Sequence, residues 1–505
     1  MTPRRYPGLI AGEIVVFAAA VAARLGVVLA SGGFGGNYGY DAGVYYAAGD
    51  ALVHGWVPYR DFVLLHPPGL MLVLAPFGWL GSLTSDHAGF VTASLAFSAL
   101  GAVNAVLVVR VARRMGVASW PALFGGGFYA LWYGAIRAEY LPRLETLGNF
   151  LLLAGLLALL AAADSRRGWL AVAGGFGLGA AASVKIWWVV PMLLVLAWQL
   201  SRDRRWPRLA LPAAGAAGAL VLINVPFLLL SHGQMWQMVV VQQLGRARDR
   251  NSVAARLFQL SGVNYLSPHL PRPAELALLA VAAVAAVAVC WLAWRTPLAR
   301  LAVVLALVQV ALLLAAPSWF SFYTDYAAPA AALTLAAGTG ALSPRRAAAG
   351  PGRLDRAARY GWVPVALAAL ETVLLVVTGR SNVVAPFPRA ALARAVADTR
   401  CLMSDSAMAQ IQLNTLSRGL AHGCQNWVDV TGKTYGPDKA ASPGIPRRAN
   451  AKWQADLRAY LLSGDAVIVI RPTGTGLSPA TAAAIRQGGV LVAVGGHAVY
   501  RTPHR

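Results

Sequence analysis

The feature that most constrains this chain is a series of long apolar runs separated by short arginine-rich segments. A helix that crosses a bilayer needs about 20 predominantly apolar residues. Hydrophobic residues make up 58% of the chain and charged residues 12%, whereas soluble globular proteins have roughly 45–50% and 25%. Polar side chains are therefore too few to cover a soluble fold of 505 residues. We predict an all-α polytopic membrane protein with about eleven transmembrane helices, at residues 8–30, 89–109, 118–135, 146–163, 169–183, 186–200, 209–230, 274–294, 298–316, 327–342 and 361–378.

The distribution of arginine predicts how these helices are oriented. Lys and Arg number 43 against 20 Asp and Glu, a net charge of +23. In a soluble protein this excess of positive charge would suggest binding to nucleic acid, but the sequence resembles no nucleic-acid-binding module. Cytoplasmic loops of membrane proteins are enriched in Lys and Arg. We therefore place the following clusters in the cytoplasm: Arg4/Arg5, Arg110/Arg113/Arg114, Arg166/Arg167, Arg202/Arg204/Arg205/Arg208, Arg295/Arg300 and Arg345/Arg346/Arg353/Arg356/Arg359.

This orientation puts the N-terminus in the cytoplasm and the C-terminus outside. The apolar residues 67–81 must not cross, because a crossing there would place the later clusters on the wrong side, so we expect an interfacial helix. The preference for Arg over Lys, with abundant Ala and Gly, is typical of a GC-rich bacterial genome, which predicts the bacterial inner membrane. The transmembrane module then covers residues 1–380, with outer loops at 31–88, 137–145, 231–272 and 317–326.

The tail, residues 381–505, is predicted to be a small extracytoplasmic α/β domain. It has strand-like runs at Asp465–Ile470 and Val490–Val494 among helical stretches. Outside the cytoplasm, Cys401 and Cys424 are candidates for a disulfide. Three further residues of the tail are candidates either for acceptor contact or for packing: Asp405, Trp427 and Asp429.

The first outer loop concentrates polar and aromatic residues around Asp41, which comes soon after the first membrane helix. Residues 42–55 are expected to form a short amphipathic helix lying on the membrane surface. Two interpretations of Asp41 remain open. It caps the N-terminus of that helix, a position that favours Asp, or it is a carboxylate placed at the membrane–water boundary to act on a substrate whose lipid tail stays in the bilayer.

Four motifs in this order resemble the GT-C glycosyltransferases, and most closely their protein-mannosyltransferase-like and aminoarabinose-transferase-like group. The resemblance covers about residues 1–380, and the tail lies outside it. The motifs are Tyr40-Asp41 with Val44-Tyr45-Tyr46-Ala47, Gly55, Pro58-Tyr59-Arg60-Asp61-Phe62 and His66-Pro67-Pro68-Gly69; Arg143-Leu144-Glu145; Gly177 with Ser183-Val184-Lys185; and Phe322-Tyr323-Thr324-Asp325-Tyr326 with Pro329.

This resemblance implies a membrane enzyme that moves a sugar from a polyprenyl-phosphate donor to an extracytoplasmic glycan, lipid or protein. The family's first-loop aspartate, matched here by Asp41, would be the general base that accepts the proton of the acceptor hydroxyl. The lipid phosphate leaves ionised and needs cations to stabilise it. Substrate contacts are expected from the matched residues Tyr40, Tyr45, Tyr59, Arg60, His66, Arg143, Glu145, Tyr323, Asp325 and Tyr326.

Lys185 is the leading candidate for a phosphate-binding cation, because it is the only Lys of the membrane part and lies at the predicted outer tip of a helical hairpin. A lysine binds phosphate as a point charge; the alternative is a helix end whose side chain snorkels to the interface. The loop at 231–272 adds a second phosphate or anionic-lipid candidate, although a solvated basic face explains it equally well. Its arginines are Arg246, Arg248, Arg250 and Arg256.

The sequence does not decide the roles of two carboxylates, Glu145 and Asp325. Glu145 should enter a membrane helix, where a carboxylate usually has a partner; it pairs with Arg143 or Arg137, or it binds a sugar hydroxyl. Asp325 stands where many relatives have His before Tyr, so its role is in doubt. No cofactor is firmly indicated, but Asp41, His66 and Asp325 would offer ligands to a divalent metal if the fold brought them together.

Three rival functions stay open: a different catalyst on a related scaffold, a transporter, and a receptor or scaffold with an outer sensing domain. A ligase using polyprenyl-diphosphate glycans would need more cations, which the arginines of the 231–272 loop would supply. A lipid or solute transporter should instead have two repeated halves with interrupted helices and charges at the bilayer midplane. In this sequence the charges outside the arginine clusters gather at one predicted face, which favours catalysis.

Overall fold

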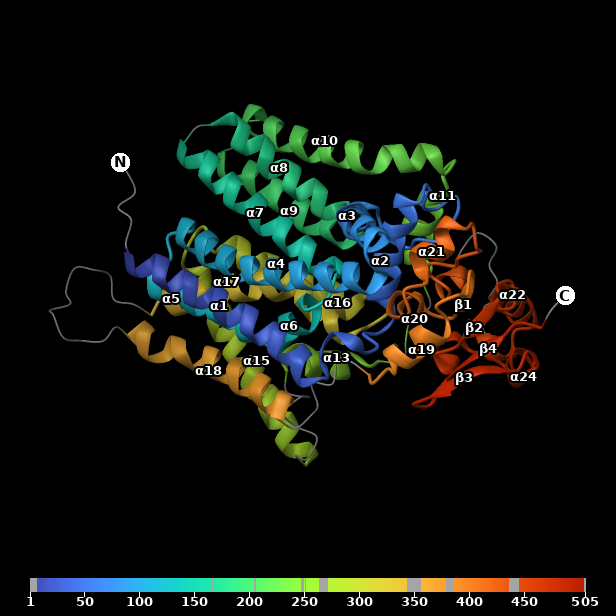
Figure 1. Cartoon of the computed structure of the whole chain (residues 1–505). Coiled ribbons are helices and arrows are strands. Elements are labelled where there is room, and N and C mark those ends of the chain that lie inside the picture. Colours follow the sequence, from blue (N-terminus) through green and yellow to red (C-terminus); the bar gives the residue numbers. More distant parts are fainter. Residues whose placement is uncertain are drawn as a thin grey trace.

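The computed structural model describes residues 7–165, 167–203, 206–246, 249, 251–262, 271–342, 356–377, 385–435 and 445–503. Figure 1 shows an elongated body of helices with a smaller unit, orange to red, at one end. The long helices of the body are α1 (Pro7–Ala30), α4 (Asp86–Arg114), α5 (Ser119–Leu131), α7 (Leu144–Ser165), α8 (Gly168–Ala182), α9 (Val189–Asp203), α10 (Trp206–Leu230), α15 (Arg272–Trp294), α16 (Arg300–Ala315), α17 (Ala328–Gly340) and α18 (Arg356–Val377).

Shorter helical segments connect them. They are η1 (Gly33–Gly35), α2 (Tyr40–Val53), α3 (Gly69–Leu83), α6 (Tyr133–Glu139), η2 (Ile186–Trp188), α11 (Gln234–Trp236), η3 (Gln237–Val241), α12 (Gln242–Leu244), α13 (Val253–Ser261) and η4 (Ser321–Ala327). Each predicted transmembrane run coincides with a helix of the body. Within the described residues, α1, α4, α7, α10 and α15 are long and apolar enough to cross a membrane. The chain is therefore a mostly helical membrane protein.

Small residues let the helices of the body approach closely. A Cβ atom on Gly175 would come 1.9 Å from the Pro212 carbonyl oxygen, and one on Gly215 would come 2.1 Å from the Val172 carbonyl oxygen. Both contacts join α8 to α10, and α7 packs on α8 as well. Helices in lipid associate through packing of this kind, because the bilayer supplies no hydrophobic force between them.

The helix predicted to lie on the surface, α2, is instead inside the protein. All its residues from Ala42 to Ala51 are buried, because α3 packs along it and because α20 (Ala407–Gln412) and α21 (Leu416–Ala421) of the C-terminal unit also contact it. The expectation of an amphipathic surface helix was wrong for this reason: its apparent polar face is covered by a part of the chain far away in sequence. The apolar run predicted not to cross forms α3, with Trp79 and Leu83 exposed.

The C-terminal unit contains a four-stranded sheet of order β1-β2-β4-β3. Strand β1 pairs in parallel with β2, whereas β4 pairs antiparallel with both β2 and β3. The strands are β1 (Leu402–Ser404), β2 (Ala466–Ile468), β3 (Val490–Val494) and β4 (His497–Arg501). The helical elements are α19 (Arg389–Ala395), α20 (Ala407–Gln412), α21 (Leu416–Ala421), η5 (Gly432–Tyr435), η6 (Arg447–Ala449), α22 (Ala451–Leu461), α23 (Pro472–Thr475) and α24 (Pro479–Arg486).

A disulfide and several polar contacts fix this unit. Cys401 and Cys424 are joined by a disulfide. The backbone of Ala385 exchanges two hydrogen bonds with Asn37, of 2.8 and 2.9 Å. Ser417 Oγ lies 2.8 Å from Asp50 Oδ2 and 2.5 Å from Asp86 Oδ1, all buried. The C-terminal unit is thus joined to the first loop and to the start of α4, which sets the geometry of the site between them.

Candidate functional site

A cavity of about 530 Å³ lies where the helical body meets the C-terminal unit. Its walls come from the start of α2, the loop before α3, the segment between α6 and α7, η4, and loops of the C-terminal unit. Among the described residues, its arginines and aspartates are Arg137, Arg143, Arg246, Arg447, Arg471, Asp41 and Asp429. The predicted site residues that line it are Tyr40, Asp41, Tyr45, His66, Arg143, Arg246 and Tyr323.

Asp41 is held at the cavity by its neighbour Tyr40. The Tyr40 hydroxyl donates to Asp429 Oδ1 at 2.7 Å and accepts the Thr431 N–H at 2.8 Å. The N-cap of α2 is Gly39, with φ of 88°, and it makes no side-chain capping bond. Asp41 is the second residue of the helix, so the capping interpretation does not describe it. Its carboxylate is instead recessed in the cavity wall.

Asp41 lies between opposing electrostatic influences. Burial raises the pKa of Asp41 above its ordinary value, with smaller increases from Asp429 and Glu145, while Arg143 and Arg471 lower it. The net effect is that the pKa of Asp41 is raised. A carboxylate with a raised pKa is a stronger base than an ordinary aspartate.

Arg143 carries a buried cation without full partners. Its side chain is 8% exposed, and its guanidinium carbon lies 3.9 Å from the centre of the Phe322 ring. The Nε and Nη1 atoms are buried and have no hydrogen-bond partner. Burying unpaired donors of a charged group is costly, so Arg143 would be stabilised by an anion that reached this wall of the cavity.

His66 and Tyr45 form the neighbouring wall. Their rings meet edge to face, with centroids 5.8 Å apart. Burial, together with the positive charges of Lys185 and Arg246, holds the pKa of His66 well below its usual range. The imidazole is therefore neutral at pH 7 and adds no positive charge to the cavity.

Lys185 is close to the cavity but does not line it. Its Nζ lies 2.8 Å from Glu145 Oε1, and the side chains are 3% and 1% exposed. The ammonium also lies 3.7 Å from the Trp187 ring and 3.9 Å from the Tyr323 ring. The partner of Glu145 is thus Lys185 rather than Arg143 or Arg137, because the turn after α8 packs against the start of α7. The snorkelling interpretation of Lys185 is wrong, since the side chain points inward.

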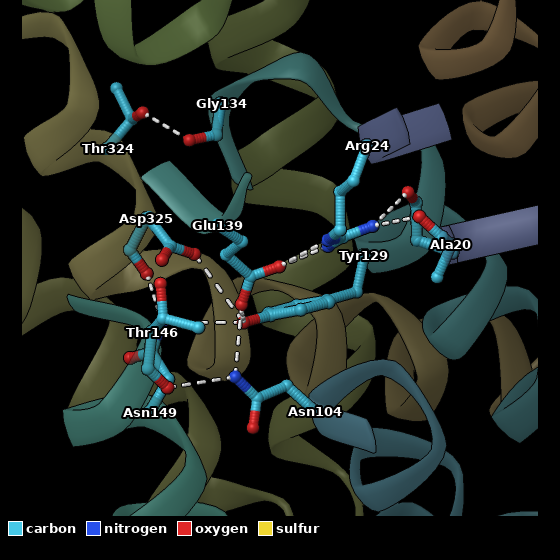
Figure 2. Close-up of polar contacts among 11 residues, drawn as sticks. Ala20, Arg24, Asn104, Tyr129, Gly134, Glu139, Thr146, Asn149, Thr324 and Asp325 are labelled. Carbon is cyan, nitrogen blue, oxygen red and sulfur yellow. Dashed lines mark hydrogen bonds and ion pairs between the residues drawn. The ribbon is translucent and has the colours of Figure 1, made fainter. Parts of the chain in front are cut away.

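Asp325 belongs to a separate buried network, shown in Figure 2. Its Oδ1 lies 3.5 Å from the Tyr129 hydroxyl, which donates to Glu139 at 2.7 Å. Glu139 is paired with Arg24, and Asn149 donates to the Asp325 carbonyl oxygen at 2.8 Å. The structure does not bring Asp325 to Asp41 and His66, so the proposed metal convergence is not found. The described residues contain no group of three or more His, Cys, Asp or Glu arranged for a metal.

Several predicted contact residues have supporting roles. The Tyr59 hydroxyl donates to the His66 carbonyl oxygen at 2.7 Å. The Tyr326 hydroxyl donates to the Trp187 carbonyl oxygen at 2.8 Å. Each therefore orients a segment beside the cavity without lining it. Arg60 is exposed and pairs with its neighbour Asp61 at 2.8 Å.

The arginines of the 231–272 loop separate into different environments. Arg246 lines the cavity. Arg256 is fully buried, where it donates to the carbonyl oxygen of Ala316 at 2.5 Å and pairs with Asp249 at 2.9 Å. Its guanidinium joins this loop to the end of α16 and is not placed to bind a substrate phosphate. Arg248 lies outside the described residues.

The tail contributes cavity residues that sequence reasoning missed. Arg447 and Arg471 were not predicted, and neither was Tyr140 of the body. Of the three tail candidates, Asp429 lines the cavity, whereas Asp405 is buried and accepts the Ile470 N–H at 2.8 Å. Trp427 stacks on Tyr460 with ring centroids 4.3 Å apart. A usable signal was the run Arg471-Pro-Thr-Gly-Thr-Gly, in which a cation is followed by flexible backbone.

Comparison with known proteins adds a family match. The model of a family described as glycosyltransferase family 87 matches residues 64–317, half of the chain. That region contains the body from the loop before α3 to the end of α16. No curated protein matches the chain.

Solved structures share the fold over most of the chain. ArnT from Cupriavidus metallidurans, bound to undecaprenyl phosphate, is 16% identical, with a TM-score of 0.53 over 97% of this chain and 98% of that one. The oligosaccharyltransferase AglB from Archaeoglobus fulgidus, in complex with an inhibitory peptide and a dolichol-phosphate, is 12% identical, with a TM-score of 0.57 over 92% and 70%. In a structure of the A. fulgidus oligosaccharyltransferase tethered with an acceptor peptide, the match spans 77% of this chain and 57% of that one, with 14% identity and a TM-score of 0.51.

Proposed function

Because the chain belongs to glycosyltransferase family 87, we propose that it moves a sugar from a polyprenyl-phosphate donor to an acceptor outside the cytoplasm. One observation carries this proposal: the carboxylate of Asp41 shares a cavity with Arg143, whose buried Nε and Nη1 atoms have no hydrogen-bond partner. A base beside an unsatisfied cation is the pair of groups that a reaction with an ionised phosphate leaving group needs.

The donor class is supported by proteins of the same fold. ArnT is described bound to undecaprenyl phosphate, and AglB in complex with a dolichol-phosphate. The acceptor class stays broad, as a cell-wall glycan, a glycolipid or a protein. The fold likeness supports the donor's lipid phosphate more directly than it supports any acceptor.

In the proposed reaction, Asp41 accepts the proton of the acceptor hydroxyl while the hydroxyl oxygen attacks the anomeric carbon of the sugar. The bond between that carbon and the phosphate oxygen breaks, and the lipid phosphate leaves with the electron pair. The products are the glycosylated acceptor, the lipid phosphate and a protonated Asp41, which later returns its proton to water. The raised pKa of Asp41 suits this role, because proton transfer to it is more favourable than to an ordinary aspartate.

The departing phosphate is stabilised in this proposal by Arg143 and Arg246 on the side of the helical body. Arg143 precedes α7, a helix long enough to cross the membrane, so its guanidinium is near the level at which a lipid phosphate would lie. Lys185 acts behind this wall: its ion pair with Glu145 and its contact with Tyr323 position the cavity lining. This assignment revises the predicted role of Lys185 as a direct phosphate ligand.

We extend the proposal to topology. Eleven crossings in a bacterial inner membrane, a cytoplasmic N-terminus and an extracytoplasmic C-terminal unit would place the cavity at the outer face. The disulfide between Cys401 and Cys424 supports this orientation, since disulfides persist in oxidising compartments. The domain division then follows residues 1–380 and 381–505.

The test uses the purified protein in nanodiscs with a panel of short-chain polyprenyl-phosphate sugars, following release of polyprenyl phosphate. We expect one donor to turn over, and Asp41→Asn to reduce kcat by roughly 10²–10⁴-fold, the usual contribution of a general base. Asp398→Asn is the matched control, because Asp398 is exposed on the C-terminal unit away from the cavity.

Donor binding is measured on the same samples to show that the variant is folded. Equal turnover by wild type and Asp41→Asn would remove Asp41 as the base. Failure of every polyprenyl-phosphate donor to bind would contradict the donor class itself.

A further inference from the structure

The C-terminal unit has a second pocket, with a volume of about 460 Å³, which shares one segment of chain with the cavity of the site. Trp427 and Lys433 line this second pocket, whereas Asp429 and Thr431, which lie between them in sequence, line the cavity that contains Asp41. Two residue steps of extended chain span at most about 7 Å, so Trp427 and Asp429 are close in space. The two pockets are therefore neighbours that have residues 427–433 in common.

The indole of Trp427 is the aromatic surface of the second pocket. It stacks on the Tyr460 ring, with centroids 4.3 Å apart and planes inclined by 4°. Tyr460 is itself buried, and its hydroxyl donates to the Ser404 carbonyl oxygen of β1 at 3.1 Å. Trp427 stays partly exposed. Because one face of the indole is covered by a ring fixed in the core of the unit, the indole is held rigidly and its remaining surface is available to the pocket.

Polar side chains that reach solvent surround this indole. Gln425 is exposed, and its amide can both donate and accept hydrogen bonds. Lys433 is partly exposed, and its ammonium lies 5.4 Å from the centre of the Trp427 ring. Lys452 Nζ lies 2.8 Å from Asp456 Oδ2, and these side chains are 58% and 39% exposed. The pocket thus combines an aromatic surface with hydrogen-bond donors and acceptors at its rim.

This combination fits a sugar ring. The faces of a pyranose present C–H groups, and its edge presents hydroxyl groups. The face of an aromatic ring is negative and attracts the partly positive hydrogens of C–H groups. Hydroxyl groups both donate and accept, so the amide, ammonium and carboxylate of the rim supply partners of both kinds. A purely apolar ligand would instead cover these polar groups without replacing their hydrogen bonds to water, which is costly.

We propose that this pocket is a sugar-binding subsite for the more distant units of an oligosaccharide acceptor, with one sugar ring on Trp427 and its hydroxyl groups bound by Gln425 and Lys433. The proposal deepens the function proposed above and depends on it for identifying the bound sugar as the acceptor. The reacting unit would lie in the cavity beside Asp41, and residues 427–433 would hold the acceptor at both pockets. The enzyme would thus prefer acceptors of several sugar units over single sugars.

The test measures binding of neutral sugars to the full-length protein in nanodiscs, with no donor present. The probes are maltotriose, mannotriose and galactotriose, each compared with the methyl glycoside of its own sugar. We expect at least one trisaccharide to bind, and its methyl glycoside to bind more weakly. Trp427→Ala should weaken trisaccharide binding by about tenfold or more, as the loss of a central aromatic contact usually does. Gln425→Ala should weaken it by about threefold to tenfold, the effect of losing a neutral hydrogen bond.

Matched variants assign the effect to the subsite. Trp427→Phe keeps an aromatic ring over Tyr460 and should keep part of the affinity, which separates the loss of the sugar contact from a folding defect. Gln487→Ala makes the same change as Gln425→Ala at an exposed position after α24, and it should leave binding unchanged. All these variants should bind short-chain polyprenyl phosphate as wild type does, because none of the changed residues lines the cavity.

Three outcomes would overturn the proposal. No trisaccharide binds, or the methyl glycosides bind as tightly as the trisaccharides, or trisaccharide binding is unchanged in both Trp427→Ala and Gln425→Ala. The last result would place the sugar elsewhere on the protein. If the trisaccharides behave as expected but no polyprenyl-phosphate sugar turns over, the sugar subsite stands and the proposed transfer reaction fails. If transfer occurs but no trisaccharide binds, the reaction stands and the subsite fails.

Discussion

Arg24 and Arg143 are both buried arginines of the helical body, yet their surroundings differ in one decisive way. Arg24 Nε lies 3.0 Å from Glu139 Oε2, its Nη1 donates to the carbonyl oxygens of Ala20 and Ala130 at 2.9 Å each, and its Nη2 pairs with Glu139. Every nitrogen thus has an acceptor. Arg143 has two buried nitrogens with none.

The two carboxylates next to these arginines differ in the same way. Glu139 receives Arg24, the Asn104 side chain at 3.0 Å and the Tyr129 hydroxyl at 2.7 Å (Figure 2). Asp41 is recessed in a cavity wall, and burial is the main influence on its pKa. A saturated pair of charges serves the fold, whereas charges that lack protein partners and face a cavity are available to a ligand. The comparison separates stability from activity, and each prediction below tests that separation.

The largest expected effect is on stability. Arg24→Met leaves Glu139 buried without its cation, which should destabilise the protein by about 3–5 kcal/mol. The measurement is the thermal unfolding midpoint in detergent. The double variant Arg24→Met/Glu139→Gln should recover much of the loss, because no unpaired charge remains, and each folded molecule should keep its sugar-transfer rate. An unchanged midpoint in Arg24→Met would show that the network is not a stabilising element.

Arg143→Gln should show the opposite pattern. Removing a cation that stabilises developing negative charge typically costs about 10²–10³-fold in kcat. The unfolding midpoint should stay the same or rise, since the variant removes buried donors that have no partner. Turnover and unfolding are measured on one preparation. A large fall in the midpoint with normal turnover would place Arg143 with Arg24 among the structural residues.

The sequence was sufficient to predict the helical body. Apolar runs of membrane length specify helices locally, since lipid offers the backbone no other hydrogen-bond partners, and the described structure has a helix at each predicted run. Asp41 and His66, which line the cavity, were also among the predicted site residues, because both lie in the motif of the first outer loop.

The contacts between distant segments were not predictable in the same way. Tyr40 and Asp429 are 389 positions apart in sequence, and no local pattern in the tail indicates that it reaches the first loop. The partner of Glu145 was missed for a related reason, as the candidates considered were neighbours in sequence while Lys185 is 40 positions away. The burial of α2 likewise depends on contacts that the local sequence does not show, with α3 and with α20 and α21 of the C-terminal unit.

Tyr40→Phe tests whether the C-terminal unit positions the base. The variant removes the hydroxyl that joins Asp429 and Thr431, and a lost hydrogen bond of this kind costs about 1 kcal/mol. We expect kcat to fall by roughly fivefold to tenfold, with little change in donor KM. Tyr500→Phe, at a half-buried position of β4, is the control. If Tyr40→Phe and Asp429→Asn reduce kcat independently rather than as one unit, Tyr40 does not act through Asp429.

The smallest effect should appear in the pH dependence of kcat/KM. Asp41 must be ionised to accept a proton, so activity should rise with pH through the pKa of Asp41. Because burial raises this pKa, the rise should occur at a higher pH than the pKa of an ordinary aspartate would give. Asp429 raises the pKa of Asp41, so Asp429→Asn should move the rise to lower pH; Arg471 lowers it, so Arg471→Gln should move the rise to higher pH. Each shift should be below about one pH unit, or 1.4 kcal/mol. Asp398→Asn should leave the profile unchanged. Shifts of the same sign in the Asp429 and Arg471 variants would mean that the acid limb reports a group other than Asp41.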